Sequence, residues 1–70
     1  MRIKFFEDTD TALLEFSSQP PVETQEVNEN VYIDLDEKGR VVSITIEHVG
    51  QLANMQELIY QRIPENLVTA

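Results

Sequence analysis

Two segments that alternate without interruption between apolar and polar residues constrain the fold of this chain more than any other feature. They are residues 31–36 (VYIDLD) and residues 41–47 (VVSITIE), and the loop EKGR separates them. A period of two is typical of a half-buried strand, and a glycine in such a loop suits the left-handed position of a hairpin turn. The sequence therefore predicts an antiparallel hairpin whose inward pairs are all apolar: Val31 with Ile46, Ile33 with Ile44 and Leu35 with Val42. A slip of one residue would bury Asp34 and Asp36, so we expect this register to be firm.

The start of the chain predicts a second hairpin. Residues 1–6 and 11–16 each alternate, and the polar break EDTD between them is suited to a turn. Pairing the two segments around this turn sets Phe5 against Ala12, Ile3 against Leu14 and Arg2 against Glu15. Apolar side chains then coincide on one face and the one basic–acidic pair is favourable, which supports the register.

The middle and the end of the chain complete the predicted architecture. Residues 17–21 form a loop with two prolines, the polar segment 22–27 predicts an edge strand, and residues 28–30 (NEN) predict a turn. Beyond Gly50 the apolar residues follow helical spacing up to Pro64: Leu52, Met55, Leu58, Ile59 and Ile63. We expect a helix at about 50–63 and a frayed tail at 65–70.

These elements predict an α+β fold in one small domain, residues 1–70. A small antiparallel β-sheet of four to five strands, arranged as a hairpin meander, takes up about residues 1–48. One C-terminal helix packs on one face of this sheet, because its apolar stripe needs a surface and the apolar face of the sheet is available.

The size of the chain favours self-association. It has 70 residues, 41% of them apolar, and no cysteine. A core this small rarely supplies more than about 3–5 kcal/mol, and no disulfide adds to it. We therefore expect a homodimer, most simply with two-fold symmetry. Leu13, Tyr32 and Val41 project from the face that the helix leaves free, and we predict them as its interface. The helix itself is the alternative contact, and scattered exposed apolar residues are also normal in a monomer.

The charge of the chain limits its partners. Thirteen acidic and five basic residues give a net charge of −8, and the basic residues are scattered. Nucleic-acid binding needs clustered Lys and Arg, so we expect no direct nucleic-acid binding, and no attraction to anionic membranes. The longest apolar run is three residues, so we expect no membrane span, and the start of the chain predicts no signal peptide. We expect a cytoplasmic protein. A basic protein is the partner that the charge favours, and charge that merely keeps the protein dispersed is the alternative.

Two groups of acidic residues resemble metal sites. Residues 34–39 (DLDEKG) imitate the opening of a calcium-binding loop, but Lys38 stands at a ligand position and Thr45 stands where the loop needs a glutamate. Glu7, Asp8 and Asp10 cluster in the first turn, where aspartate is also favoured because its side chain bonds nearby amides. We therefore predict no metal site and no cofactor.

The sequence offers no complete catalytic set. His48 is the only histidine, and Glu47 beside it points to the opposite face if both lie on a strand. Asp34 and Ser43 face each other in the predicted pairing, but without a histidine they make no nucleophilic arrangement. His48 is most simply a residue at the end of a strand. We predict no catalytic residue and no enzyme.

Four pieces of this chain, within about residues 1–49, resemble a known family: IKFF at residue 3, DTAL at residue 10, VETQEV at residue 22 and, above all, VYIDLDEKGRVVSITIEH at residue 31. The chain resembles the small bacterial family called Domain of Unknown Function 2283. That resemblance implies a small antiparallel sheet domain and no assigned activity. It also implies an antitoxin-like role, because members are thought to stand beside small basic toxins. Many members end differently after the position of Ile46.

The sequence therefore predicts a small acidic interaction or accessory protein, antitoxin-like in binding a basic partner protein. The alternative is a small metal-dependent or acidic hydrolase. A binding protein would show a contiguous acidic face or an exposed apolar patch, whereas an enzyme would need a pocket with convergent polar groups.

Overall fold

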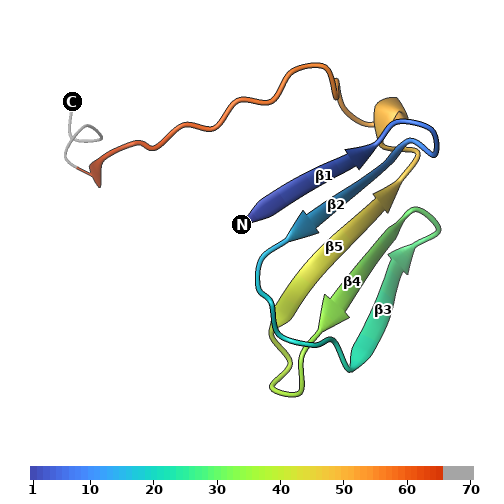
Figure 1. The fold of residues 1–70 in the computed structure, drawn as a ribbon, viewed down its shortest axis with the longest axis vertical. Coiled ribbons are helices and arrows are strands. Elements are labelled where there is room, and N and C mark those ends of the chain that lie inside the picture. Colours follow the sequence, from blue (N-terminus) through green and yellow to red (C-terminus); the bar gives the residue numbers. More distant parts are fainter. Residues whose placement is uncertain (66–70) are drawn as a thin grey trace.

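The computed structural model describes residues 1–65, which form one five-stranded antiparallel sheet (Figure 1). The strands are β1 (Arg2–Phe6), β2 (Thr11–Glu15), β3 (Glu23–Asn28), β4 (Val31–Leu35) and β5 (Val41–Glu47). One turn of 3-10 helix, η1 (Val49–Gln51), follows β5. The order across the sheet is β1-β2-β5-β4-β3, so the β1–β2 hairpin joins the β3–β4–β5 meander through the pairing of β2 with β5. The predicted sheet and the edge position of β3 are confirmed.

The registers of the two predicted hairpins are confirmed over most of their length. In the first, Phe5 pairs with Ala12, Ile3 with Leu14 and Arg2 with Glu15. In the second, Val31 pairs with Ile46 and Ile33 with Ile44. Alternation within the strands is sufficient to fix these pairs, because each keeps apolar side chains on one face.

The predicted pairing of Leu35 with Val42 is wrong. Leu35 pairs with Val41, and the register shifts between Asp34 and Leu35. The cause is a tighter turn than the four-residue loop that the sequence predicts: Asp36 and Arg40 close it, with an N–H···O bond of 2.9 Å from Asp36 to Arg40. Gly39 in this turn has φ of 77°, the left-handed conformation of a three-residue hairpin loop with a bulge. Val42 is the extra residue in β5, because Leu35 pairs with Val41 and Asp34 pairs with Ser43.

The predicted C-terminal helix at 50–63 is also wrong, and with it the α+β class. Within residues 1–65 the helical structure is 3-10 in type, and beyond η1 the chain runs on as an extended arm, which we define as residues 52–65 (Figure 1). A short isolated helix is marginal unless its apolar face packs on a surface, and the arm leads away from the sheet. Asn54 adds a competing local bond, since its Oδ1 accepts from the Gln56 N–H at 3.1 Å. The predicted frayed tail lies outside the described residues except for Glu65.

Strand alternation gives the sheet two chemically different faces. One, which we call the apolar face, carries eleven apolar side chains: Ile3, Phe5, Ala12, Leu14, Phe16, Val31, Ile33, Leu35, Val42, Ile44 and Ile46. The other, which we call the Tyr32 face, carries mostly polar side chains: Arg2, Lys4, Leu13, Glu15, Thr24, Glu26, Tyr32, Asp34, Ser43, Thr45 and Glu47. Among residues 1–65 only three apolar side chains are buried: Ala12, Val42 and Val49.

Candidate functional site

The centre of the Tyr32 face is a tyrosine surrounded by carboxylates. Tyr32 lies on β4 between Thr45 of β5 and Glu26 of β3. Its hydroxyl donates to the main-chain carbonyl of Glu29 at 3.1 Å, which fixes the ring at the β3–β4 turn. Burial, followed by the carboxylates of Glu47, Glu26 and Glu29, raises the pKa of Tyr32 above its ordinary value. Tyr32 is therefore a neutral hydrogen-bonding aromatic group in an acidic setting.

The carboxylates around Tyr32 lack cationic neighbours. In the described part of the chain there are two ion pairs, Lys4 with Glu15 at 3.3 Å and Arg40 with Asp36 at 3.2 Å. Lys4 lies on β1, three strands away from β4 in the sheet order. The β5–β4–β3 half of the Tyr32 face therefore carries negative charge that the protein itself leaves uncompensated.

Asp34 organises the neighbouring row of this face. Its Oδ2 accepts from the Ser43 hydroxyl at 2.8 Å, and its Oδ1 accepts from the Thr24 hydroxyl. The carboxylate thus ties β4 to both neighbouring strands. The sequence predicted that Asp34 and Ser43 face each other, and this is confirmed. Their bond holds strands together and lacks the histidine that nucleophilic chemistry needs.

Asp36 supports the β4–β5 turn, which accounts for the resemblance of this loop to a calcium site. Its side chain is 7% exposed. Oδ1 accepts from the N–H groups of Lys38 and Arg40, both at 2.9 Å, and Oδ2 accepts from Arg40 Nε at 3.2 Å. These bonds, that from the Arg40 N–H first, lower the pKa of Asp36 below 3.8. Both carboxylate oxygens of Asp36 therefore accept hydrogen bonds from residues of the turn itself.

A second aspartate, Asp10, connects the β1–β2 turn to η1, which follows the last strand. Asp10 has φ of 54°, and its main-chain carbonyl accepts from the Val49 N–H at 3.0 Å. Its carboxylate accepts from the Gly50 N–H at 3.0 and 3.1 Å. Asp10 thereby fastens η1 to the β1–β2 turn. The other two acids of that turn, Glu7 and Asp8, are exposed.

We expect Gly50→Ala to destabilise the protein by about 1–2 kcal/mol. A Cβ at this position would lie 2.9 Å from Asp10 Oδ1, so the tether has to shift. Thermal unfolding of Gly50→Ala, Asp10→Ala and the double variant measures this effect. The two losses should be less than additive, because either change disrupts the same contact. Full additivity would show that Gly50 acts elsewhere.

His48 lies at the end of β5, as the sequence predicted, and it is exposed. It has φ of 54°, and its Nδ1 lies 3.0 Å from Asn30 Oδ1, so the ring braces the β3–β4 turn. Glu47 belongs to the Tyr32 face instead. The structure does not bring the two side chains into one hydrogen-bonded pair.

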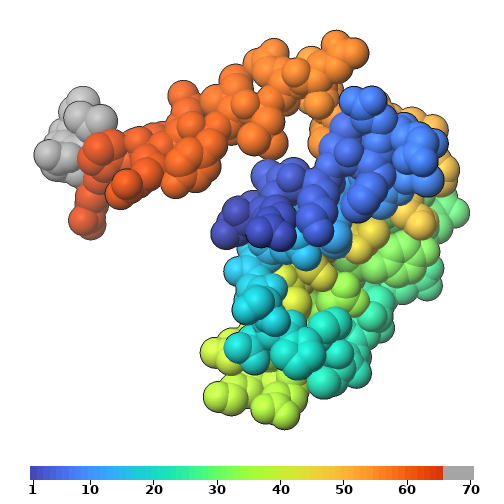
Figure 2. Space-filling model, viewed as in Figure 1, coloured from blue at the N-terminus to red at the C-terminus, as the bar shows by residue number. Residues whose placement is uncertain are grey.

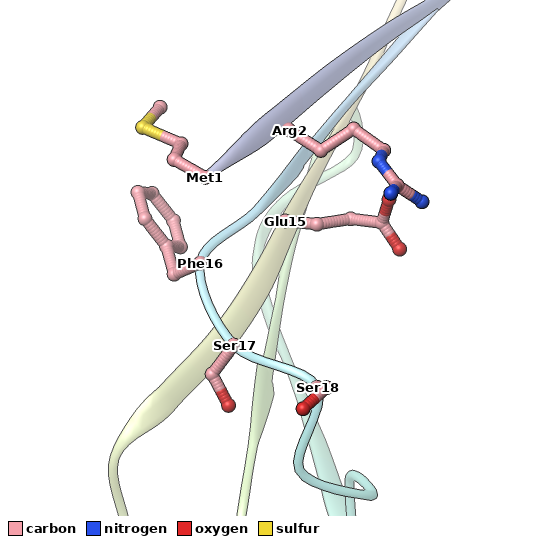
Figure 3. A pocket seen from close by; sticks show the side chains of 6 residues that line it. All are labelled: Met1, Arg2, Glu15, Phe16, Ser17 and Ser18. Carbon is pink, nitrogen blue, oxygen red and sulfur yellow. The ribbon is translucent and has the colours of Figure 1, made fainter.

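A depression of about 300 Å³ lies at the open end of the β1–β2 hairpin. Figure 3 shows that Met1 and Phe16 point to one side of the ribbon, whereas Arg2 and Glu15 point to the other. The polar groups that line it therefore do not converge on one point, as a catalytic pocket requires. Within residues 1–65 no group of three His, Cys, Asp or Glu side chains is placed to hold a metal ion. No helix in this part of the chain is long and apolar enough to cross a membrane.

Two of the three predicted interface residues, Leu13 and Tyr32, belong to the Tyr32 face, whereas Val41 pairs with Leu35 and does not adjoin them. Leu13 and Tyr32 flank Thr45 in a single row. Val41, 41% exposed, lies further along β5, beyond Ser43. The sequence gives no sign that Glu26 and Glu29 neighbour Tyr32, because β3 has too few apolar residues to reveal its register and carries a bulge between Glu26 and Asn28.

The comparisons with known proteins concern this same sheet. A family model described as Protein of unknown function (DUF2283) matches residues 2–49. The chain belongs to this family. No curated protein and no solved structure matches it. The DUF2283 match spans all five strands and ends within η1, so the Tyr32 face and the apolar face both lie inside it, whereas the arm lies outside.

Proposed function

We propose that this DUF2283 protein is a non-catalytic interaction protein that binds a basic partner protein through the Tyr32 face. The observation that carries the proposal is the ring of Glu26, Glu29 and Glu47 around Tyr32, which has no cation of its own. A partner that presents Lys or Arg side chains would supply the missing charges. The net charge of −8 would speed its approach by long-range attraction.

The chemistry of Tyr32 suits such a contact. Tyrosine and arginine are enriched among the residues that dominate binding energy, and an arginine stacks on an aromatic ring while it pairs with carboxylates. Tyr32 is half-buried and held by its bond to Glu29, so little conformational freedom is lost when a partner docks on it. The sheet beneath gives the contact a rigid base.

An antitoxin-like role follows as the specific form of this proposal. The protein would neutralise a small basic protein by covering its cationic surface, in the bacterial cytoplasm. The carboxylates of the Tyr32 face would attract the partner, and the activity that is neutralised would belong to the partner.

Capture from the native host followed by a binding measurement tests the proposal. The immobilised wild-type protein should retain a basic protein, which is then purified and titrated by calorimetry. We expect the double variant Glu26→Gln/Glu47→Gln to weaken binding about tenfold or more and to reduce its salt dependence, because both carboxylates leave the contact. Tyr32→Ala should weaken it similarly.

The matched control is Glu7→Gln/Asp8→Asn, which removes the same two charges from the exposed β1–β2 turn. We expect this variant to bind within about twofold of wild type. Equal losses in the two double variants would mean that net charge alone attracts the partner. That result, or a retained partner without basic character, would contradict the proposed site.

A further inference from the structure

The apolar face is bare in the described part of the chain. The sheet is a single layer, and the arm leads away from it (Figure 2). Ile3 is 40% exposed and Phe16 is 43% exposed, although both point to the side where a core would form. Even Ile33 and Ile44, in the central row, are only partly buried. A sheet with one apolar face is stable in water only when a second layer covers that face.

The accessible surface area of the chain leaves room for an interface of ordinary size. The accessible surface of the chain is 5923 Å². A compact protein of its mass would expose about 4,500 Å², so the excess is about 1,400 Å². A stable protein–protein interface buries about 800 Å² on each partner. The extended arm contributes to this excess, since Leu58, Ile59 and Tyr60 are 69–80% exposed, and the bare apolar face contributes as well. One interface of ordinary size on that face fits within the excess.

The distribution of charge decides what kind of surface fits here. On strands β1, β2, β5 and β4 the apolar face carries no charged side chain, since those charges alternate onto the Tyr32 face. A foreign basic partner gains nothing from such a surface. The edge strand β3 adds one charge to this face, Glu23, which pairs with Leu35. Over the other four strands a second copy of this chain presents the same uncharged surface, and it keeps the acidic residues of β2, β4 and β5 in both copies on the outside.

We propose that a second copy of this chain covers the apolar face, so that two sheets pack face to face as a two-layer β-sandwich. A two-fold axis makes the contact self-complementary, and side chains of the two inner faces interdigitate in the usual core of a sandwich. This places the dimer contact on the face opposite to Leu13 and Tyr32, two of the three residues that the sequence predicts for it. The contact does not depend on the basic partner.

Sedimentation equilibrium of the purified full chain tests the proposal. We expect wild type at micromolar concentration to have twice the chain mass of 8.1 kDa. Phe16→Asp places a charge in the contact and should lose the two-chain species. Phe6→Asp is the matched control, because Phe6 is 46% exposed and lies on the other side of β1 from Ile3 and Phe5. It should remain a dimer.

Each outcome decides the question. A single-chain mass for wild type overturns the proposal, whether the arm folds back over the sheet or another protein covers it. Equal dissociation of the two Phe variants overturns it as well. If Phe16→Asp fails to fold, Ile3→Lys at the edge strand and a melting temperature that rises with wild-type concentration replace it. Added salt should preserve the dimer, whereas it should weaken binding to a basic partner. The proposed dimer and the proposed binding site can therefore be disproved separately.

Discussion

Ile44→Asp should abolish the folded domain. Ile44 occupies the middle of the apolar face, between Leu14 of β2 and Ile33 of β4. In the proposed dimer a carboxylate there is surrounded by hydrocarbon and has no partner, which costs about 3–5 kcal/mol. That loss is comparable to the whole stability that a core of this size provides. Circular dichroism should show the loss of the strand signal at neutral pH.

Val41→Asp on the same strand is the control. Val41 is exposed at the start of β5, so the same introduction of a carboxylate should alter the free energy of unfolding by less than about 1 kcal/mol. If Ile44→Asp folds as well as Val41→Asp, the apolar face is not the core side of the sheet. The proposed dimer would then lose its basis too.

Asp36→Ala should lower the melting temperature at pH 7 by roughly 10 °C. The change removes the acceptor of three hydrogen bonds in the β4–β5 turn. The pKa of Asp36 is lowered in the folded state, so its ionised form stabilises the fold above pH 3.8, and this contribution is lost as the pH falls through the lowered pKa. The difference between wild type and variant should therefore narrow in acid.

Thermal melts at pH 7 and near pH 3 measure this dependence. Glu37→Gln is the matched control, because Glu37 lies in the same turn but is exposed. It should melt close to wild type at both values. A gap between wild type and Asp36→Ala that stays constant with pH would show that the turn depends on the shape of the side chain and not on its charge.

The two hairpins were predictable because each of their strands alternates between apolar and polar residues. In the rows of Ile33 with Ile44 and Ile3 with Leu14, a shifted pairing would put charges among apolar side chains, so alternation alone fixes the register. The pairing of β2 with β5 carries no such local signal, since the β3–β4 hairpin lies between them in the chain.

The failures have different physical causes. The helical spacing from Leu52 to Ile63 shows only where apolar residues occur in the sequence. A helix of this length also needs a surface to pack on, and the arm leads away from the sheet. The pairing of Leu35 was missed because Asp36 draws the turn tight with its side chain. The acidic surroundings of Tyr32 depend on β3, whose polar sequence leaves its register open.

The separation of apolar and acidic side chains onto opposite faces also sets the stoichiometry of binding. A dimer closed through the apolar faces displays two identical Tyr32 faces, one on each outer surface. If both proposals hold, such a dimer would bind two partner molecules, or one partner that carries two cationic sites. The second contact then forms at high effective concentration, so a weak individual contact becomes a slowly dissociating complex.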